Sequence, residues 1–479
     1  MGVITIGAKE FIRGVSTAND LPDGGFSPDD KGQNLLSNPG TMNQGTDLTQ
    51  LNTNIVHEIF AAADDEQSAI GGLNLLYMVG RGVGGSDEAE FYQWDAIGNQ
   101  PTLVQTDDSS AARTYSNSIT QMEYYNNEIF ATSSNNIAKL TASMAAIDPD
   151  WWSTVATANT LNTGVAHPLL KFDKKLWVGN KHQLDYWDGS AGVEAALDLT
   201  AKESGVIMAL ALDPGTGKML IATSPNTSDA TNHVGKIYTW DGFSPVPNSV
   251  ARFNGYITAM YTFGGVVYVF YDDMIGFWNG SGVTPIRKLK IDRSTDDYIF
   301  RSRVTSIGDT LLITEQNAIL AYGSIISGGR KVWYYPHTAT KNLGLLHGIS
   351  VNKVAVADIN ATSTLFGHID MSVSTPNLST VFKTNNYFLP SNSRIKKIEI
   401  LTNALASSGS VVVKLRKSGS PTTDTTVGTF DTQGDSQVTF SNLKIDTASV
   451  QLRITFAGQN DVINIKQIKI HYDALEKQV

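Results

Sequence analysis

The chain has 479 residues, no cysteine and a charged fraction of only 17%. It is longer than one ordinary compact core, and the lack of cysteine excludes disulfides and thiolate metal sites. The formal net charge is −10, and the first 379 residues carry 24 Lys and Arg against 38 Asp and Glu. Because phosphate contacts need clustered cations, we expect no nucleic-acid partner.

The start of the chain, MGVITIGAKEFIRG, lacks the basic and then apolar regions of a secretory signal. No apolar run approaches the roughly 18 residues of a membrane span, so we expect no membrane insertion. Residues 1–53 are predicted to form an N-terminal arm, because NDLPDGGFSPDDKGQNLLSNPG is too rich in turn residues for a sheet. Within the arm, we expect Phe11 to Val15 to form a strand that closes the fold formed by the repeats that follow.

A short sequence motif recurs along the body of the chain. It reads QLDYWDGS from Gln183, KIYTWDGFS from Lys236 and MIGFWNGSG from Met274, with a looser copy, FYQWDAIG, from Phe91. In the three closest copies the aromatic residue is followed by Asp-Gly or Asn-Gly, the pairs that best tolerate the positive φ angles of a tight hairpin. Each copy of the motif therefore predicts a strand that is followed by a tight turn.

The repeat has the period of a β-propeller blade. Seven copies are marked by residues spaced 38 to 53 positions apart, namely Trp94, Leu140, Trp187, Trp240, Trp278, Tyr322 and Phe366. Four short strands per unit of about 45 residues are typical of propeller blades. We predict a seven-bladed β-propeller over residues 54–371. Evenly spaced strands also suit a β-sandwich array, but the regular hairpin order favours the propeller.

The repeated aromatic residues are expected to pack between neighbouring blades, where a large side chain covers the gap between two sheets. The alternative is that Trp187, Trp240 and Trp278 bind a ligand. The adjacent pair Trp151 and Trp152 falls outside the repeat. Because neighbouring residues of a strand point to opposite faces, we expect one of this pair in the core and the other as an anchor for a protein contact.

After the propeller, residues 372–392 are polar, are interrupted by prolines and are expected to be a linker. Six segments of residues 393–479 alternate apolar and polar side chains, and the clearest of them places on one face Val411, Val413 and Leu415. Six such half-buried strands predict a small antiparallel β-sandwich, similar to a jelly roll. The alternation slips between Ile465 and Ile468, which predicts a β-bulge. The fold class expected for the whole chain is all-β.

The search for catalytic motifs finds none. There is no HExxH and no G-x-S-x-G, and DPGTGKML lacks the first glycine and the final Ser or Thr of a P-loop. The histidines have no metal-ligand spacing, and LPDGGFSPDDKG lacks the spacing of a calcium loop. Four carboxylates remain as candidates for a glycosidase pair, namely Asp64, Asp65, Asp107 and Asp108. Acidic loops are common, so these four carboxylates alone do not indicate a glycosidase. Because the other motifs are missing, we expect no enzyme, no cofactor and no metal.

Three stretches together resemble tail-associated structural proteins of tailed bacteriophages. They are the opening KEFIRGVSTANDLPDGGFSPDDKGQNL, the weakly charged repeats with YWDG-type turns, and the closing RIKKIEILTNALASSGSVVVKLRKS. The resemblance covers the organisation of the whole chain. It implies a non-enzymatic component of the virion, in its tail, tail tip or fibre, that is assembled in the bacterial cytoplasm. It further implies that the partners are other virion proteins, including further copies of this chain.

If the resemblance holds, neighbouring subunits order the N-terminal arm. The apolar residues Phe11, Phe26 and Leu35 are then candidates for the contact, with Phe26 as its anchor. Two other functions stay open. The protein could be a lectin-like module that binds a host glycan or receptor, which requires exposed aromatic residues, or a propeller enzyme that degrades polysaccharide, which requires a carboxylate pair.

Overall fold

A computed structural model describes residues 1–11, 42–43, 49–52, 56–59, 75–81, 89–95, 102–107, 121–141, 146–155, 161–199, 205–225, 234–291, 299–316, 318–324, 331–338, 343–348, 353–358, 366–371, 381–405, 409–417, 424–457 and 463–475. The helical elements within these ranges are short, namely α1 (Ala8–Phe11), α3 (Trp151–Val155) and the 3-10 helix η3 (Arg301–Arg303). All other regular elements described are strands. The expected all-β class is therefore confirmed.

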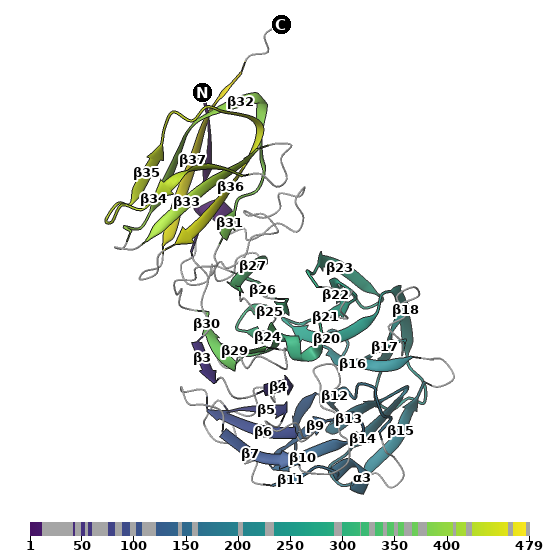
Figure 1. Ribbon diagram of the computed structural model, residues 1–479. Coiled ribbons are helices and arrows are strands. Elements are labelled where there is room, and N and C mark those ends of the chain that lie inside the picture. Colours follow the sequence, from purple (N-terminus) through teal and green to yellow (C-terminus); the bar gives the residue numbers. More distant parts are fainter. Residues whose placement is uncertain are drawn as a thin grey trace.

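Six four-stranded sheets are each built from consecutive strands and form the blades of a β-propeller (Figure 1). Blade 1 contains β4 (Val56–Ile59), β5 (Leu75–Arg81), β6 (Ala89–Asp95) and β7 (Thr102–Asp107). Blade 2 contains β8 (Met122–Tyr125), β9 (Glu128–Thr132), β10 (Ile137–Thr141) and β11 (Ile147–Asp148). Blade 3 contains β12 (Leu169–Phe172), β13 (Lys175–Asn180), β14 (Gln183–Trp187) and β15 (Gly192–Asp198).

The remaining three of these blades follow the same order. Blade 4 contains β16 (Val206–Asp213), β17 (Lys218–Ser224), β18 (Val234–Trp240) and β19 (Ser249–Asn254). Blade 5 contains β20 (Ile257–Phe263), β21 (Val266–Tyr271), β22 (Met274–Trp278) and β23 (Val283–Lys288). Blade 6 contains β24 (Val304–Ile307), β25 (Thr310–Glu315), β26 (Ala318–Ser324) and β27 (Lys331–Thr338). In each blade the first strand lies innermost, as the contacts of β16 with β20 show, and the fourth lies on the outside.

One further four-stranded sheet joins distant parts of the chain. It consists of β28 (Leu343–Gly348), β29 (Lys353–Asp358), β30 (Phe366–Asp370) and β3 (Thr49–Asn52), which pairs antiparallel with β30. The position expected for Phe11 to Val15 is held by β3; Phe11 ends the helical turn α1, and residues 12–15 lie outside the described residues. Because β4 of blade 1 begins four residues after β3 ends, this pairing ties the last sheet of the ring to the first.

The C-terminal strands do not form a separate sandwich, which corrects the expectation from the sequence. They belong to a nine-stranded sheet that also includes two N-terminal strands. Its members are β1 (Gly2–Ile6), β2 (Met42–Asn43), β31 (Val381–Lys383), β32 (Tyr387–Thr402), β33 (Ser410–Lys417), β34 (Asp424–Phe430), β35 (Gln437–Phe440), β36 (Ile445–Ala457) and β37 (Asn464–Ala474). Five residue pairs join β1 to β37, so the N-terminus covers an edge that the C-terminal strands would otherwise leave open.

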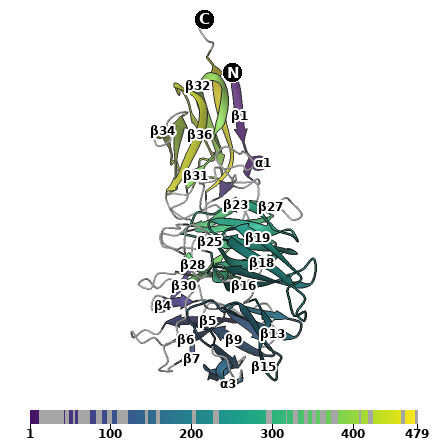
Figure 2. The same cartoon turned by 90° about the vertical axis from the view of Figure 1, so that its right-hand side faces the viewer.

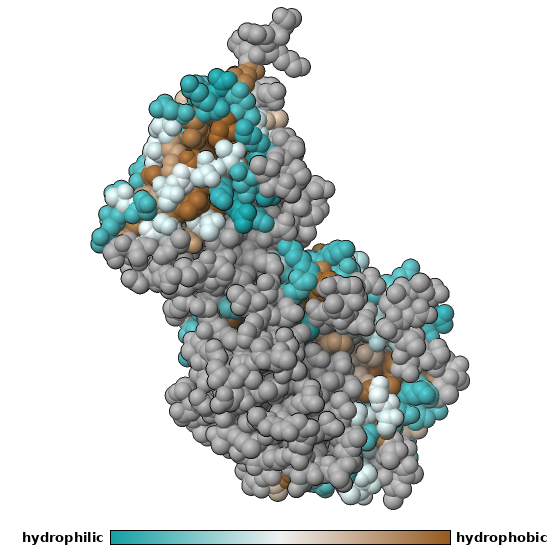
Figure 3. Space-filling view, in the orientation of Figure 1, coloured by the Kyte–Doolittle hydropathy of each residue, from teal (hydrophilic) through white to brown (hydrophobic). Residues whose placement is uncertain are grey.

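The expected alternation in this sheet is confirmed. Val411, Val413 and Leu415 are fully buried, whereas Lys414 and Arg416 are partly exposed. The register of β32 with β37 shifts between Gln467 and Ile465, where the slip in the sequence predicted a bulge. On the face turned to the viewer in Figure 3, apolar residues of this sheet lie between hydrophilic ones.

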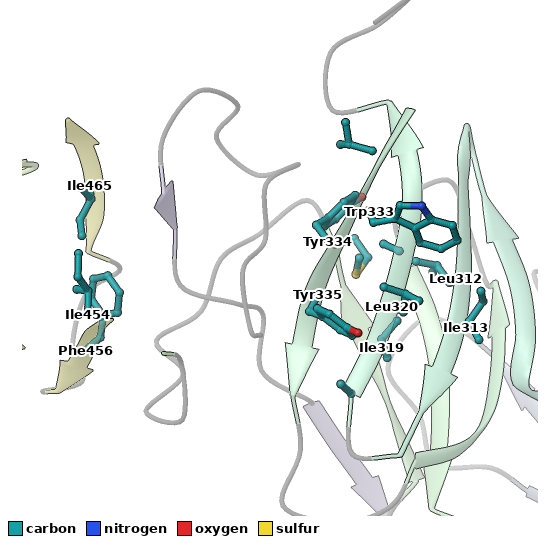
Figure 4. Close-up of a cluster of buried hydrophobic side chains, with 14 of the residues drawn as sticks. Leu312, Ile313, Ile319, Leu320, Trp333, Tyr334, Tyr335, Ile454, Phe456 and Ile465 are labelled. Carbon is teal, nitrogen blue, oxygen red and sulfur yellow. The ribbon is translucent and has the colours of Figure 1, made fainter. Parts of the chain in front are cut away.

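Both parts of the molecule have a dense apolar core. In blade 6, Leu312, Ile319 and Tyr334 are fully buried (Figure 4). In the nine-stranded sheet, Ile454 and Ile465 are equally inaccessible. Figures 1 and 2 both show this sheet beyond the end of the ring near β23 and β27.

Candidate interaction surface

Three turns of the propeller share one hydrogen-bonded design. The Oδ1 atoms of Asp188, Asp241 and Asn279 each accept hydrogen bonds from the backbone amides two and three residues ahead, at 2.8 to 3.1 Å. The glycine that follows each has a φ between 91° and 99°, which glycine adopts without strain. The expected turns are therefore present, but side-chain capping by the Asp or Asn stabilises them.

Hydrogen bonds within the turns favour the ionised form of two carboxylates. Hydrogen bonds from the Ser244 hydroxyl and from backbone amides hold the pKa of Asp241 well below its usual range. Bonds from the amides of Ala191 and Ser190 lower the pKa of Asp188 in the same way. These shifts stem from turn stabilisation, and they need no ligand to explain them.

The repeated aromatic residues pack against the preceding blade, as predicted. The ring of Trp240 in blade 4 meets that of Trp177 in blade 3 edge to face, with centroids 5.1 Å apart. Tyr322 of blade 6 similarly meets Tyr268 of blade 5 at 6.4 Å. Trp278 is buried among residues of blades 4 and 5. Little of the surface of Trp240 and Trp278 is left for a ligand, so their role is structural. Trp187 is partly exposed and packs against the ring of Trp151.

The expectation that one of Trp151 and Trp152 is an exposed anchor is wrong. Their side chains are only 2% and 0% exposed. The two residues begin the helix α3 rather than lying on a strand, so they do not point to opposite faces. Trp151 contacts the ring of Trp187 in blade 3 at 5.2 Å, and also that of Phe130 in blade 2 at 4.7 Å. The pair therefore fills the gap between these blades.

Phe243, in the turn between β18 and β19, is an exposed aromatic residue that the sequence analysis did not single out. It stands three positions after Trp240, where the other two turns carry Ser190 and Ser281. Its side chain is 81% exposed. The turn beneath it is held in place, since Trp240 Nε1 donates a hydrogen bond to the Ser244 carbonyl oxygen at 2.7 Å. An apolar residue where both matching turns carry serine was the available signal in the sequence.

Other exposed apolar residues lie on the same hairpin. Val246, Val250 and Val234 are 51%, 46% and 43% exposed. With Phe243 they form a surface on β18, β19 and their connecting turn, which we call the blade-4 rim (Val234, Phe243, Val246 and Val250). Figure 2 turns this side of the ring toward the viewer. Phe243 and Val246 lie in the turn and Val234 lies at the opposite end of the hairpin, beside Asn254, and exposed apolar side chains of this kind are candidates for interaction.

A buried polar network in blade 3 has a structural explanation. Asn180 Nδ2 donates to Asp185 Oδ2 at 3.0 Å, and the Ala195 amide donates to Asp185 Oδ1 at 2.8 Å. Burial raises the pKa of Asp185. Nearby, the buried His167 is bonded through Nδ1 to the Gly179 carbonyl oxygen at 3.0 Å, and burial lowers its pKa. Each group has its partners within the sheet, so the network fixes the strands.

A second set of buried polar and aromatic residues lies at the interface between blade 5 and blade 6. The Tyr335 hydroxyl donates a hydrogen bond to Glu315 Oε2 at 2.5 Å, and both residues are buried. The guanidinium of Arg287, from β23, lies 5.2 Å from the ring centre of Trp333 in β27. Burial, together with the Glu315 charge, raises the pKa of Tyr335. This arrangement crosses the interface between two blades and is enclosed by them.

The inner strands bring few carboxylates to the propeller axis. Among the first strands β4, β8, β12, β16, β20, β24 and β28 the acidic residues are Glu58, Glu123 and Asp213. Asp213 accepts hydrogen bonds from the Gly215 amide and the Thr216 hydroxyl of its own turn. Of the glycosidase candidates, only Asp107 falls in the described residues, as the last residue of β7. Asp64, Asp65 and Asp108 lie outside the described residues.

The remaining expectations concern the arm and possible ligands. Phe26 and Leu35 lie outside the described residues, and Phe11 is described only as part of α1. The described part of the chain contains no group of three or more His, Asp or Glu residues placed to hold a metal ion. None of its helices is long and apolar enough to cross a membrane.

No protein-family model matches the chain, and no curated protein does either. Among solved structures, the chain is similar to the Dos1 propeller, with 12% identity over 63% of this chain and 75% of that one, at a TM-score of 0.39. The Cps50 (Swd1) propeller domain of Myceliophteria thermophila is 7% identical over 68% of this chain and 98% of that domain, at 0.42. An exo-β-1,3-galactanase from Phanerochaete chrysosporium is 10% identical over 90% of this chain and all of that one, at 0.32. The strand order, rather than these distant likenesses, identifies the propeller.

Proposed function

We propose that the protein is a non-enzymatic structural component of a tailed-phage virion, located in the tail, tail tip or fibre. In this proposal the six blades and the closing sheet act together as a seven-bladed ring. The ring is a rigid scaffold that holds interaction surfaces in place, and the partners are other virion proteins. The resemblance of the sequence to tail-associated proteins supports the location.

The exposed ring of Phe243 is the observation that carries the interaction role. An apolar side chain 81% exposed gains nothing from folding of the free protein. Its turn is already fixed by Asp241, so Phe243 loses little conformational freedom when a partner covers it. Aromatic residues held in this way are typical of hot spots in protein interfaces.

A matched substitution tests this role within the particle. Phe243→Ser gives the turn the residue that its two counterparts carry, so the fold should be unchanged. Phage with this change should incorporate less of the protein into purified particles than phage with Ser281→Ala, which alters an equivalent turn. Equal incorporation of both variants would argue against Phe243 as a contact. Phe26→Ser tests the arm in the same assay.

Phe388 supports a second candidate, a lectin-like module that binds a host glycan or receptor. It lies on β32 of the nine-stranded sheet and is 82% exposed. Glycan-binding sites commonly stack sugar rings on exposed aromatic residues. A glycan array probed with the intact protein and with Phe388→Ala distinguishes the two candidates. Binding that is lost in the variant would favour the lectin, and no binding would favour the structural role.

A further inference from the structure

The outer strands of a propeller are open sheet edges, and most of those in this protein are guarded against pairing. Natural sheets guard edges with bulges, prolines and charges. The register shifts where β7, β15, β23, β27 and β3 pair with their inner neighbours. In addition, Pro285 lies in β23 and Pro336 lies in β27. The outer strand β11 has only two residues, which is too short to pair stably with a further strand.

The outer strand β19 has neither a register shift nor a proline. It pairs with β18 through six residue pairs without a register shift, the only described outer strand longer than two residues that does so. Its sequence, SVARFN, has no proline and a single charge, Arg252. No described strand pairs with its outer edge. A regular, uncovered edge of this kind is a template for another strand.

The sequence of β19 suits pairing with a second copy of itself. Around a two-fold axis normal to the sheet each side chain keeps its face, so only registers centred on a residue are possible. A centre at Arg252 would place two guanidinium groups opposite each other, and a centre at Val250 would shorten the overlap. A centre at Ala251 places each Arg252 opposite the Val250 of the other copy, and no like charges meet.

The exposed apolar residues fit the same arrangement. Antiparallel pairing brings the Val250 end of one β19 beside the Asn254 end of the other. Val234 is the residue paired with Asn254 within each copy, and it is 43% exposed. Phe243 and Val246, which lie just before β19 in the chain, are therefore carried toward Val234 of the second copy. The Phe243 end of each hairpin therefore lies beside the Asn254 end of β19 in the other copy, and Val234 lies one strand further in.

We propose that two copies of the protein associate through β19, so that blade 4 of one copy and blade 4 of the other form one continuous antiparallel sheet. Ala251 lies at the two-fold axis, and the turn that carries Phe243 lies beside the Asn254 end of β19 in the other copy. This association depends on the geometry of β19 and would hold whether or not the protein is a virion component.

A cysteine at the axis gives a direct test, because the natural chain has no cysteine. Directly opposite residues of antiparallel strands have Cα atoms about 4.5 to 5.5 Å apart, within the range of a disulfide. Ala251→Cys in the full chain should therefore form a disulfide-linked dimer under mild oxidation, seen as a doubling of the 51.7 kDa mass. Thr284→Cys, on the outer strand β23, is the matched control and should cross-link far more slowly. Equal rates for the two variants would overturn the proposal.

Light scattering of non-covalent dimers provides the second test. Val250→Lys places a cation opposite Arg252 of the other copy and should abolish the dimer, whereas Val250→Glu forms an opposite-charge pair and should retain it. Phe243→Ser should weaken dimerisation at least about tenfold. Circular dichroism confirms that each variant is folded. A natural protein that stays monomeric at all concentrations, or equal effects of Lys and Glu at position 250, would overturn the proposal.

Discussion

The indole rings of Trp177 and Trp240 meet edge to face across two neighbouring blades, with an interplanar angle of 85°. Both residues are 1% exposed. The contact joins the second strand of blade 3 to the third strand of blade 4, so it holds together sheets that share no strand. The repeated aromatic residue therefore stabilises the packing of neighbouring blades against each other.

Removing one of these rings should lower stability substantially. We expect Trp240→Ala to reduce the free energy of unfolding by about 3 to 5 kcal/mol, as for other large truncations in a core. The partly exposed Trp187 is the matched comparison, and its replacement by Ala should cost less. Urea unfolding followed by fluorescence measures both. A smaller loss for Trp240 than for Trp187 would contradict the packing described here.

The Asp241 turn should make stability depend on pH in the acid range. The pKa of Asp241 is lowered in the folded protein, so its contribution is present above the unfolded value of about 3.9 and is lost as the pH falls toward the folded value. Asp241→Asn keeps the acceptor oxygen without the charge, as Asn279 does in the next blade. We expect the melting temperature of the natural protein to fall more steeply between pH 5 and pH 2 than that of the variant. Parallel melting curves would count against the role assigned to this carboxylate.

The strand β3 should close the propeller. Replacing Thr49–Asn52 by Gly-Ser-Gly-Ser should weaken its pairing with β30 and speed amide hydrogen exchange in Phe366–Asp370. The same replacement within β1 should instead speed exchange in β37, with which β1 pairs. Unchanged exchange in β30 after the first replacement would show that β3 is dispensable for closure.

The non-enzymatic role predicts that the protein will not cleave polysaccharide. Incubation with bacterial envelope polysaccharides should release no new reducing ends. Binding without cleavage would instead favour the lectin candidate. Turnover that a single carboxylate substitution abolishes would establish the enzyme and refute the structural role.

The propeller could be predicted from the sequence because its signal is local and repeated. Strand, aromatic residue and Asp-Gly or Asn-Gly turn lie within a few residues of one another, as in the segment from Gln183 to Ser190. The closure by β3 could not be predicted, because TQLN has no apolar alternation and pairs through its backbone with a strand more than 300 positions away. The pairing of Gly2–Ile6 with the last strand of the chain is non-local for the same reason.

The candidate surface was only partly visible in the sequence. Burial of Trp240 follows from its place in the repeat, but nothing in the local pattern shows that Trp151 and Trp152 begin a short helix and fill a gap between blades. Phe243 differs from its serine counterparts in the repeat, yet its exposure depends on where the turn lies in the ring. The sequence therefore predicts the scaffold better than the surface that it presents.

The most direct test of the proposed function is quantitative mass spectrometry of tailed-phage particles purified from bacterial cultures that express this chain. We expect the protein to remain with density-purified particles in a fixed ratio to other tail proteins, and a cryo-electron microscopy map of those particles to show the ring in the tail. If the protein were absent from the purified particles and recovered only from the cell lysate, the virion role would be refuted.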